Sequence, residues 1–294
     1  MEKHVIAVVF CVVAAIYFLV RSRMRVRCSS HVTLDLLTGT YHTRYEFHRF
    51  RVRDPTNSAA WVTSCNSDYF PGVLKLYKSL QKVGSKFPLV CLCTDSTTSS
   101  QELELNAQGI ETIRVSIASI SNPYDQKWTE AFVKLECWKL VQYAKVCWID
   151  SDIIQLQNGD ELMEIPLADH GIACAVDHET FPPPEERVCF RMFQSGLFVL
   201  KPSFVTYNRL TANLGVVTSA DGGDQGFLTS FYATFDFQPV VFLSSAYNYG
   251  KRGMIRHKEY DIKKIKNLHF VGHPKPWKGG EPGYEHLQAI WDQI

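Results

Sequence analysis

The spacing of apolar and polar residues divides the chain into three parts. Residues 5–20 form an unbroken apolar run without a charged residue, proline or glycine. Residues 23–58 carry scattered arginine and histidine and show no sustained periodicity. From residue 59 onward, short apolar runs alternate with amphipathic stretches, which is typical of a layered α/β domain with a largely parallel sheet. We therefore predict a membrane anchor at 1–22, a stem at 23–58 and an α/β domain at 59–294.

The apolar run at residues 5–20 fits a short transmembrane helix or the core of a signal peptide. A cleavable signal would have small residues after the run, whereas Arg21, Arg23, Arg25 and Arg27 follow it here. An uncleaved anchor is therefore favoured over a removed signal. The arginines after the span favour a cytosolic position for the main domain, because cytosolic flanks of membrane spans are enriched in positive charge.

The α/β domain is predicted to begin with four strands separated by helices. Val73, Leu76, Tyr77 and Leu80 recur at the spacing of one helix face. The expected order is strand 60–63, a helix through 73–80, strand 89–93, a helix from Ser99 or Ser100 to Gly109, strand 110–117, helix 129–143 and strand 146–149, then strands 172–176 and 197–200 and helices after 203 and 223.

The strand at 146–149 ends on Asp150-Ser151-Asp152. In open α/β sheets, ligands bind beyond the carboxyl ends of the strands. Two carboxylates at such an end can hold a divalent cation, which in turn neutralises phosphate charge. A chain with fifteen aspartates contains about one Asp-x-Asp by chance. The tripeptide therefore indicates a metal site only together with its position and with further motifs.

Composition narrows the class of protein. With 46% hydrophobic residues, the chain of 294 residues has enough apolar surface for a full core. Its 31 basic and 30 acidic residues give a net charge of +1, which argues against a nucleic-acid binder held by phosphate electrostatics. The nine cysteines form no disulfide pattern, and we expect them to be buried free thiols.

Four ordered motifs over roughly residues 59–278 resemble those of the glycogenin-like glycosyltransferase family 8, which also includes galactinol synthases. They are Asp150-Ser151-Asp152, Gln194-Ser195-Gly196, the stretch DGGDQG at 221–226 and the stretch HFVGHPKPW at 269–277. The resemblance implies a GT-A fold, that is, a Rossmann-like α/β nucleotide-diphospho-sugar transferase domain.

The resemblance also implies that Asp150, Asp152 and His269 hold Mn2+, with Mg2+ as an alternative. This mixed carboxylate and imidazole set suits a borderline cation such as manganese. Considered alone, His269 would more often be an ordinary core or surface histidine. Gly272 would allow the backbone to approach the donor phosphates, and Lys275 would supply a positive charge to them.

Other residues receive roles toward the sugar and the nucleotide from the same resemblance. Asp224 and Gln225 would lie at the reaction centre and Asp221 at the sugar, although an aspartate there can also cap a helix. Lys134 matches a family lysine that reaches the donor sugar or phosphate, which implies a catalytic as well as a donor-binding role, and a solvated lysine on a polar helix face is its alternative. The remaining donor-binding residues would be Asn66 and Tyr69 at the uridine, where packing is an alternative for the tyrosine, together with Ser151, Gln194, Ser195 and Gly196.

Two stretches depart from the family pattern. The usual Asn-Ser-Gly is Gln194-Ser195-Gly196 here, which lengthens an amide at a sugar-contacting position and leaves the donor sugar open. The loop in which glycogenin modifies its own tyrosine corresponds to residues 249–255, where no tyrosine occupies the matching place. A self-glucosylating glycogen primer is therefore not expected.

The sequence predicts a retaining, Mn2+-dependent hexosyltransferase with a UDP-sugar donor, most simply UDP-glucose. UDP-galactose, UDP-N-acetylglucosamine and UDP-glucuronate are alternative donors, and a catalytically lapsed nucleotide-sugar or glycan binding protein is an alternative function. The expected partners are the donor, a glycan, glycolipid or glycoprotein acceptor, and a membrane through residues 5–20. A signal-anchor with a stem favours a lumenal domain in the Golgi or endoplasmic reticulum, and a domain facing the cytosol stays open.

Overall fold

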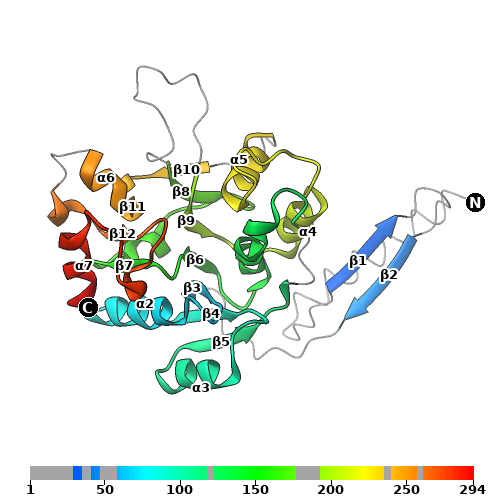
Figure 1. Cartoon of the computed structure of the whole chain (residues 1–294). Coiled ribbons are helices and arrows are strands. Elements are labelled where there is room, and N and C mark those ends of the chain that lie inside the picture. Colours follow the sequence, from blue (N-terminus) through cyan, green and yellow to red (C-terminus); the bar gives the residue numbers. More distant parts are fainter. Residues whose placement is uncertain are drawn as a thin grey trace, which may run out of the picture. The chain divides into compact units, whose positions relative to one another are not determined.

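The computed structural model describes residues 29–34, 41–46, 58–117, 122–176, 193–234, 240–256 and 261–294. The predicted anchor at residues 5–20 lies outside these ranges. Within them, the chain forms no helix with the length and apolarity that a membrane span requires. The chain divides into two compact units, residues 1–52 and residues 53–294, of which the second carries the larger sheet (Figure 1).

The first unit contains a two-stranded antiparallel hairpin where the sequence analysis expected no regular structure. Strand β1 (Ser29–Leu34) pairs with β2 (Tyr41–Glu46), and Ser29 lies opposite Glu46. Apolar and polar residues alternate here only over six-residue stretches, with Val32 and Leu34 in one strand and Tyr41 and Tyr45 in the other, and this short alternation was not recognised as a pair of strands.

The second unit is built on a seven-stranded mixed sheet in the order β10-β8-β9-β6-β3-β4-β5. Only β9 runs antiparallel to its neighbours, β6 and β8, so the sheet is largely parallel as predicted. Its strands are β3 (Ala59–Cys65), β4 (Leu89–Cys93), β5 (Glu111–Arg114), β6 (Lys145–Ile149), β8 (Ile172–Val176), β9 (Phe193–Leu200) and β10 (Val240–Leu243).

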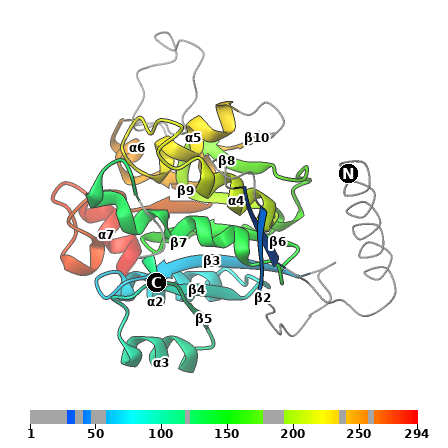
Figure 2. The ribbon, with the colours of Figure 1, turned by 90° about the vertical axis from the view of Figure 1, so that its right-hand side faces the viewer.

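Both faces of this sheet are covered, because successive side chains of a strand point to opposite faces. Val146 and Trp148 belong to one buried cluster, whereas Cys147 and Ile149 belong to another. The helices around the sheet are α2 (Phe70–Lys82), α3 (Ser99–Ala107), α4 (Phe204–Ala212), α5 (Asp224–Thr234) and the 3-10 helices η2 (Gln126–Lys139) and η3 (Asp160–Glu164). Figures 1 and 2 show α2 on one side of the sheet and α4 and α5 on the other.

A second, three-stranded sheet extends the domain toward its carboxyl end, in the order β11-β12-β7. Its core joins Ile154 and Leu268 to Leu287 and Trp291 of the last helix. That helix, α7, also contacts α2, since the Lys75 ammonium lies 5.7 Å from the centroid of the Trp291 ring. The elements are β7 (Ile153–Gln155), η5 (Ser245–Tyr247), β11 (Tyr249–Gly250), α6 (Lys251–Arg256), η6 (Ile262–Lys264), β12 (Asn267–His269), η7 (Pro276–Lys278) and α7 (Glu285–Asp292).

Several predicted boundaries were wrong. The expected α-helix at 129–143 is the 3-10 helix Gln126–Lys139, and it is buried from Phe132 to Trp138 because elements pack against both of its sides. Thr98, rather than Ser99 or Ser100, caps α3, since its side chain accepts from the Gln101 backbone nitrogen. The strand expected at 110–117 is shorter, and the short strands β7, β10, β11 and β12 were not predicted because two to four residues show no periodicity.

The prediction of buried free thiols is confirmed for the cysteines that the structure describes. These are Cys65, Cys91, Cys93, Cys137, Cys147 and Cys174.

A close contact at Gly72 fixes α2 against the loop that follows β6. A Cβ at this position would lie 2.5 Å from the backbone oxygen of Ser151 and 2.9 Å from the Trp277 ring. We expect Gly72→Ala to lower the free energy of unfolding by about 1–2 kcal/mol. The Ser151 backbone oxygen cannot move away without displacing its loop, and this clash outweighs the higher helix propensity of alanine. Urea unfolding measures this change, with Lys78→Ala on the exposed face of the same helix as the control. Equal stability of the two variants would contradict the contact.

Candidate active site

All fifteen residues to which the sequence analysis gave site roles line one cavity of about 530 Å3. The cavity lies where β3, β6 and β9 meet the start of α5 and the segment after β12. Segments between residues 64 and 275 therefore contribute to it, as the position beyond the strand ends predicts.

The candidate metal ligands converge in this cavity. Asp150 follows β6, Asp152 precedes β7, and His269 ends β12, which pairs with β7 so that His269 lies opposite Ile153. One possible ligand atom from each of the three side chains lies within 4.8 Å of the other two. His269 Nε2 is 3.1 Å from Asp152 Oδ1 and 3.9 Å from Asp150 Oδ2. The arrangement can hold one divalent cation.

A chain of amides orients the His269 ring. The side-chain nitrogen of Asn248 donates to the side-chain oxygen of Gln194, so the Asn248 oxygen faces His269 Nδ1 at 2.9 Å. This contact fixes the ring so that Nε2 faces the two carboxylates. Gly196 makes room for the ring, because a Cβ there would lie 2.5 Å from His269 Cε1. The glycine of the Gln-Ser-Gly motif is thus required by packing.

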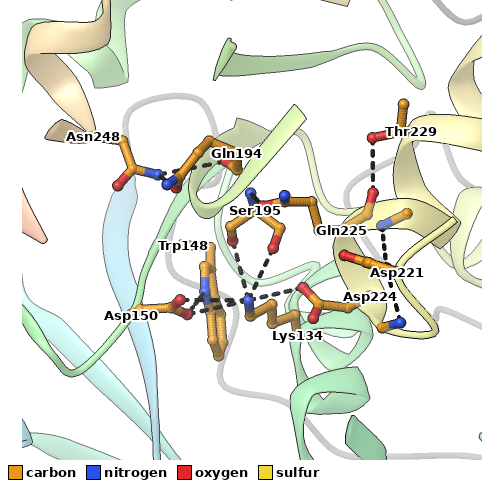
Figure 3. A network of polar contacts seen from close by, with 12 residues as sticks. Lys134, Trp148, Asp150, Gln194, Ser195, Asp221, Asp224, Gln225, Thr229 and Asn248 are labelled. Atoms are coloured by element: carbon orange, nitrogen blue, oxygen red, sulfur yellow. Dashed lines mark hydrogen bonds and ion pairs between the residues drawn. The ribbon is translucent and has the colours of Figure 1, made fainter. Parts of the chain in front are cut away.

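Lys134 lies at the centre of the cavity, where it bridges two carboxylates. Its ammonium is 2.8 Å from Asp224 Oδ2 and 3.3 Å from Asp150 Oδ1, and it donates to the backbone oxygen of Ser195 at 3.2 Å. Figure 3 shows this lysine between the three groups. Lys134 is only 6% exposed, so the alternative of a solvated surface lysine is wrong.

A second lysine, Lys275, forms an ion pair with Asp152 Oδ2 and donates to the backbone oxygen of Phe270 at 3.2 Å. Asp150, Asp152 and Asp224 thus face Lys134 and Lys275. One formal negative charge is left over among these five groups, which fits a cation better than it fits an anion.

The two aspartates of the Asp-Ser-Asp motif differ in acidity. Burial alone would raise the pKa of the Asp152 carboxyl, but Lys275 and His269 outweigh it and hold this pKa well below its usual range. Burial raises the pKa of the Asp150 carboxyl, with Lys134 acting against the shift and Asp152 adding to it. Burial would lower the pKa of Lys134, yet Asp150 and Asp224 raise it, so this lysine stays charged.

The turn at 221–226 is held together by Asp221. Its Oδ1 accepts from the backbone nitrogens of Gly223 at 2.8 Å and Gly226 at 3.0 Å, just before and within the first turn of α5. Asp221 is therefore a helix cap in this structure. The cap presents Asp224 to Lys134, and the side-chain oxygen of Gln225 accepts from the Ser195 backbone nitrogen at 3.0 Å, which joins the turn to β9.

Asn66 and Tyr69 line the cavity at the end of β3. Asn66 accepts from the Tyr69 backbone nitrogen at 2.8 Å and donates to Glu130, which fixes the turn. The Tyr69 ring packs edge-on against Trp277, with centroids 5.4 Å apart. The packing alternative for this tyrosine is thus supported by a contact, while its ring also borders the cavity.

Three other residues complete the walls. Gly272 has a φ of +87°, a conformation that favours glycine, and it brings backbone to the cavity surface. Ser151 and Ser195 also line the cavity, and the strand that carries Ser195 is held beside Asp150 because Asp150 N donates to the backbone oxygen of Gly196 at 2.8 Å.

Several residues of this site were not predicted from the sequence. The indole nitrogen of Trp148 donates to Asp150 Oδ1 at 2.7 Å and thereby orients that carboxylate (Figure 3). Its position two residues before Asp150, on the same face of the strand, was an available signal. Asn248, Trp128 and Glu130 gave no comparable signal, because their contacts join segments far apart in the sequence.

Comparison with known proteins places the chain in a family. The model of the family described as Glycosyl transferase family 8 matches residues 61–280. The chain is 30% identical over 251 residues to glycogenin-1 of Caenorhabditis elegans, covering 81% of this chain and 55% of that protein. It is 30% identical to glycogenin-1 of Oryctolagus cuniculus, with 81% and 75% covered, and 29% identical to galactinol synthase 1 of Solanum lycopersicum, with 76% and 74% covered.

Solved structures share the fold. The galactosyltransferase LgtC, solved with donor and acceptor sugar analogues, superposes with a TM-score of 0.60 at 13% identity, covering 80% of this chain and 96% of LgtC. The glycosyltransferase GlyE of Streptococcus pneumoniae gives 0.57 at 20% identity, with 80% and 59% covered. The second unit therefore has the α/β fold of nucleotide-sugar transferases. Together with the family match over residues 61–280, this shows that the chain belongs to glycosyltransferase family 8 and is a glycosyltransferase.

Proposed function

We propose that this chain transfers a hexose, glucose in the first instance, from a UDP-sugar to an acceptor hydroxyl with net retention and with Mn2+ as cofactor. The observation that carries the proposal is the convergence of Asp150, Asp152 and His269 with the Lys134 and Asp224 ion pair in one cavity. Glucose rests on the similarity to glycogenin, and the manganese preference rests on the ligand set.

Asp150, Asp152 and His269 would hold the cation, which when bound supplies positive charge to the diphosphate of the donor. In the reaction, the bond from the anomeric carbon to the diphosphate oxygen breaks, a bond to the acceptor oxygen forms, and the proton of the acceptor hydroxyl passes to the departing diphosphate. Lys275 is placed to leave Asp152 and neutralise the departing diphosphate, because its ammonium already lies beside the cation site.

Asp224 is the carboxylate that we assign to the reaction centre. It is 6% exposed, and its Oδ2 forms an ion pair with the Lys134 ammonium at 2.8 Å. A buried carboxylate of this kind stabilises the positive charge that develops at the anomeric carbon. Gln225 would act with it by holding the β9 motif through Ser195, and Asn66 and Tyr69 would border the nucleoside.

The competing function is a nucleotide-sugar or glycan binding protein that has lost catalytic activity. It is suggested by Gln194, which stands where the family motif has asparagine. The longer amide of Gln194 is accommodated by its bond to Asn248, which in turn orients His269. The substitution therefore leaves the candidate cation site assembled and does not favour loss of activity.

A glycogen primer that modifies a tyrosine near residue 249 is not proposed. Tyr249 is the tyrosine at the start of that stretch, and it is buried in the core below the second sheet. The acceptor that we propose is instead a separate glycan, glycolipid or glycoprotein.

We predict that the enzyme releases UDP from UDP-glucose in the presence of Mn2+ faster than from UDP-galactose, UDP-N-acetylglucosamine or UDP-glucuronate. Initial rates with each donor at equal concentration measure this order. Preference for another of the four sugars would overturn the assignment of glucose, whereas binding of all donors without UDP release would support the lapsed protein.

Asp152→Asn should lower the rate of UDP release by about 10²- to 10³-fold, since it removes one charge from the cation site while preserving shape. Isothermal titration with Mn2+ should show a parallel loss of affinity. Asp169→Asn is the matched control, because the Asp169 side chain is 88% exposed and pairs only with Lys201 among the contacts described. Wild-type Mn2+ affinity in Asp152→Asn would contradict the ligand assignment.

Residues 5–20 remain the proposed membrane anchor on sequence grounds, with the domain in the lumen of the Golgi or endoplasmic reticulum. We expect deletion of residues 1–22 to move the protein from the carbonate-resistant membrane fraction to the supernatant. In microsomes, the domain should resist added protease until detergent is present. Digestion without detergent would place it on the cytosolic side, and full extraction of the intact chain by carbonate would refute the anchor.

A further inference from the structure

The cavity has a buried end and an exposed rim. Lys134 and Asp224 at the buried end are each 6% exposed. Trp128, which lines the same cavity, is 45% exposed and is among the few large hydrophobic side chains on the described surface. A single exposed hydrophobic side chain is common on a protein surface, but an indole that lines a cavity also offers a ligand a flat apolar face.

The surroundings of Trp128 place it beside the proposed reaction centre. A Cβ on Gly223 would lie 3.5 Å from Trp128 Cγ, so the indole packs against the backbone immediately before Asp224. The ring is therefore supported from the α5 side. It belongs to the first turn of η2, whose Asp125 cap accepts from the Lys127 backbone nitrogen and fixes the start of that helix.

The other contact of the indole is weak and easily displaced. The Lys127 ammonium lies 5.4 Å from the ring centroid and pairs with Asp125 at 3.0 Å. The side chains of Lys127 and Asp125 are 65% and 40% exposed, and exposed ion pairs hold their geometry only loosely. A ligand with hydroxyl groups can replace this ammonium over the ring and accept hydrogen bonds from it.

The chemistry of the rim fits a sugar ring. The C–H groups on one side of a pyranose pack on an aromatic face, while its hydroxyls need polar partners around that face. Lys127 and Glu130, which neighbour Trp128 in the sequence and line the same cavity, supply such partners. A protein side chain as acceptor would gain less from this combination of one flat apolar surface and a polar border.

We propose that Trp128 forms the acceptor subsite and that the acceptor is a glycoside whose terminal pyranose ring stacks on this indole beside Asp224. The proposal rests on the proposed function, and it deepens it by choosing a glycan acceptor over a protein side chain. The deep end of the cavity is left for the donor sugar, so the indole affects transfer to the acceptor and not the binding of the nucleotide.

The test compares wild type, Trp128→Ala and Trp128→Tyr with UDP-glucose and Mn2+. The acceptor probes are p-nitrophenyl α-glucoside, p-nitrophenyl β-glucoside and p-nitrophenyl β-galactoside, and product is measured by chromatography. With the best probe, Trp128→Ala should lower kcat/KM for the acceptor about 10-fold or more, mainly through KM, because it removes the stacking surface. Trp128→Tyr should recover most of that loss, since it restores an aromatic face.

The affinity for UDP, measured by calorimetry, distinguishes acceptor binding by Trp128 from nucleotide binding by Trp128. Trp128→Ala should change it by less than about 2-fold, a difference of under about 0.5 kcal/mol. Leu103→Ala, at a side chain 70% exposed on α3, is the control for loss of an exposed apolar group. It should leave the acceptor kcat/KM and the UDP affinity unchanged.

Each remaining outcome decides the proposal. Unchanged acceptor kinetics in Trp128→Ala, or a loss of UDP affinity as large as the loss in kcat/KM, would overturn the acceptor subsite. Transfer to none of the three glycosides by a wild type that still hydrolyses UDP-glucose would overturn the glycoside class while leaving the proposed function intact. A wild type that neither hydrolyses nor transfers from any of the four UDP-sugars would remove the proposed function, and the acceptor subsite with it.

Discussion

The site depends on how three carboxylates are kept together out of bulk water. Asp150, Asp152 and Asp224 would repel one another in a buried cavity, and Lys134 and Lys275 offset most of that repulsion. Because two positive charges face three negative ones, the five side chains keep a net charge of −1. That remaining negative charge is the physical reason why a cation fits. The ion pairs with the aspartates explain why both lysines are buried rather than solvated.

The fold places these charged side chains together by joining short segments from many parts of the chain. The loop after β6 lies between Gly72 of α2 and Gly196 of β9, and Phe270 N donates to the Asp152 backbone oxygen at 3.0 Å. Neither glycine tolerates a side chain without a clash. The glycines of these motifs therefore follow from close packing around the charged cluster, in addition to any role toward the donor.

Much of this arrangement was predictable from sequence. The alternation of apolar runs and amphipathic stretches gave the parallel core of the sheet, and the position of Asp150 and Asp152 after β6 placed the site. The long segments were found because periodicity is visible over ten residues. The short strands β7 and β12, which align His269 with the aspartates, are three residues each and carry no such signal.

The errors have physical causes as well. The pattern around Lys134 suggested one polar face on an α-helix, yet η2 is a 3-10 helix buried on both sides, so Lys134 and Glu136 are inside. Trp148 orients Asp150, and Asn248 orients His269. Contacts of this kind, made to a candidate ligand rather than to the cation, cannot be derived from a motif. Only the three-dimensional arrangement shows that Gln194 acts on His269 through Asn248.

The most direct test of the charge cluster as a cation site is a crystal of the protein soaked with Mn2+ and UDP and measured at the manganese absorption edge. The account predicts one strong anomalous peak within bonding distance, about 2.0–2.4 Å, of Asp150, Asp152 and His269, with Lys275 moved from Asp152 toward the diphosphate. A peak held by other side chains, or UDP bound in the cavity with Lys275 still on Asp152 and no manganese beside it, would contradict it.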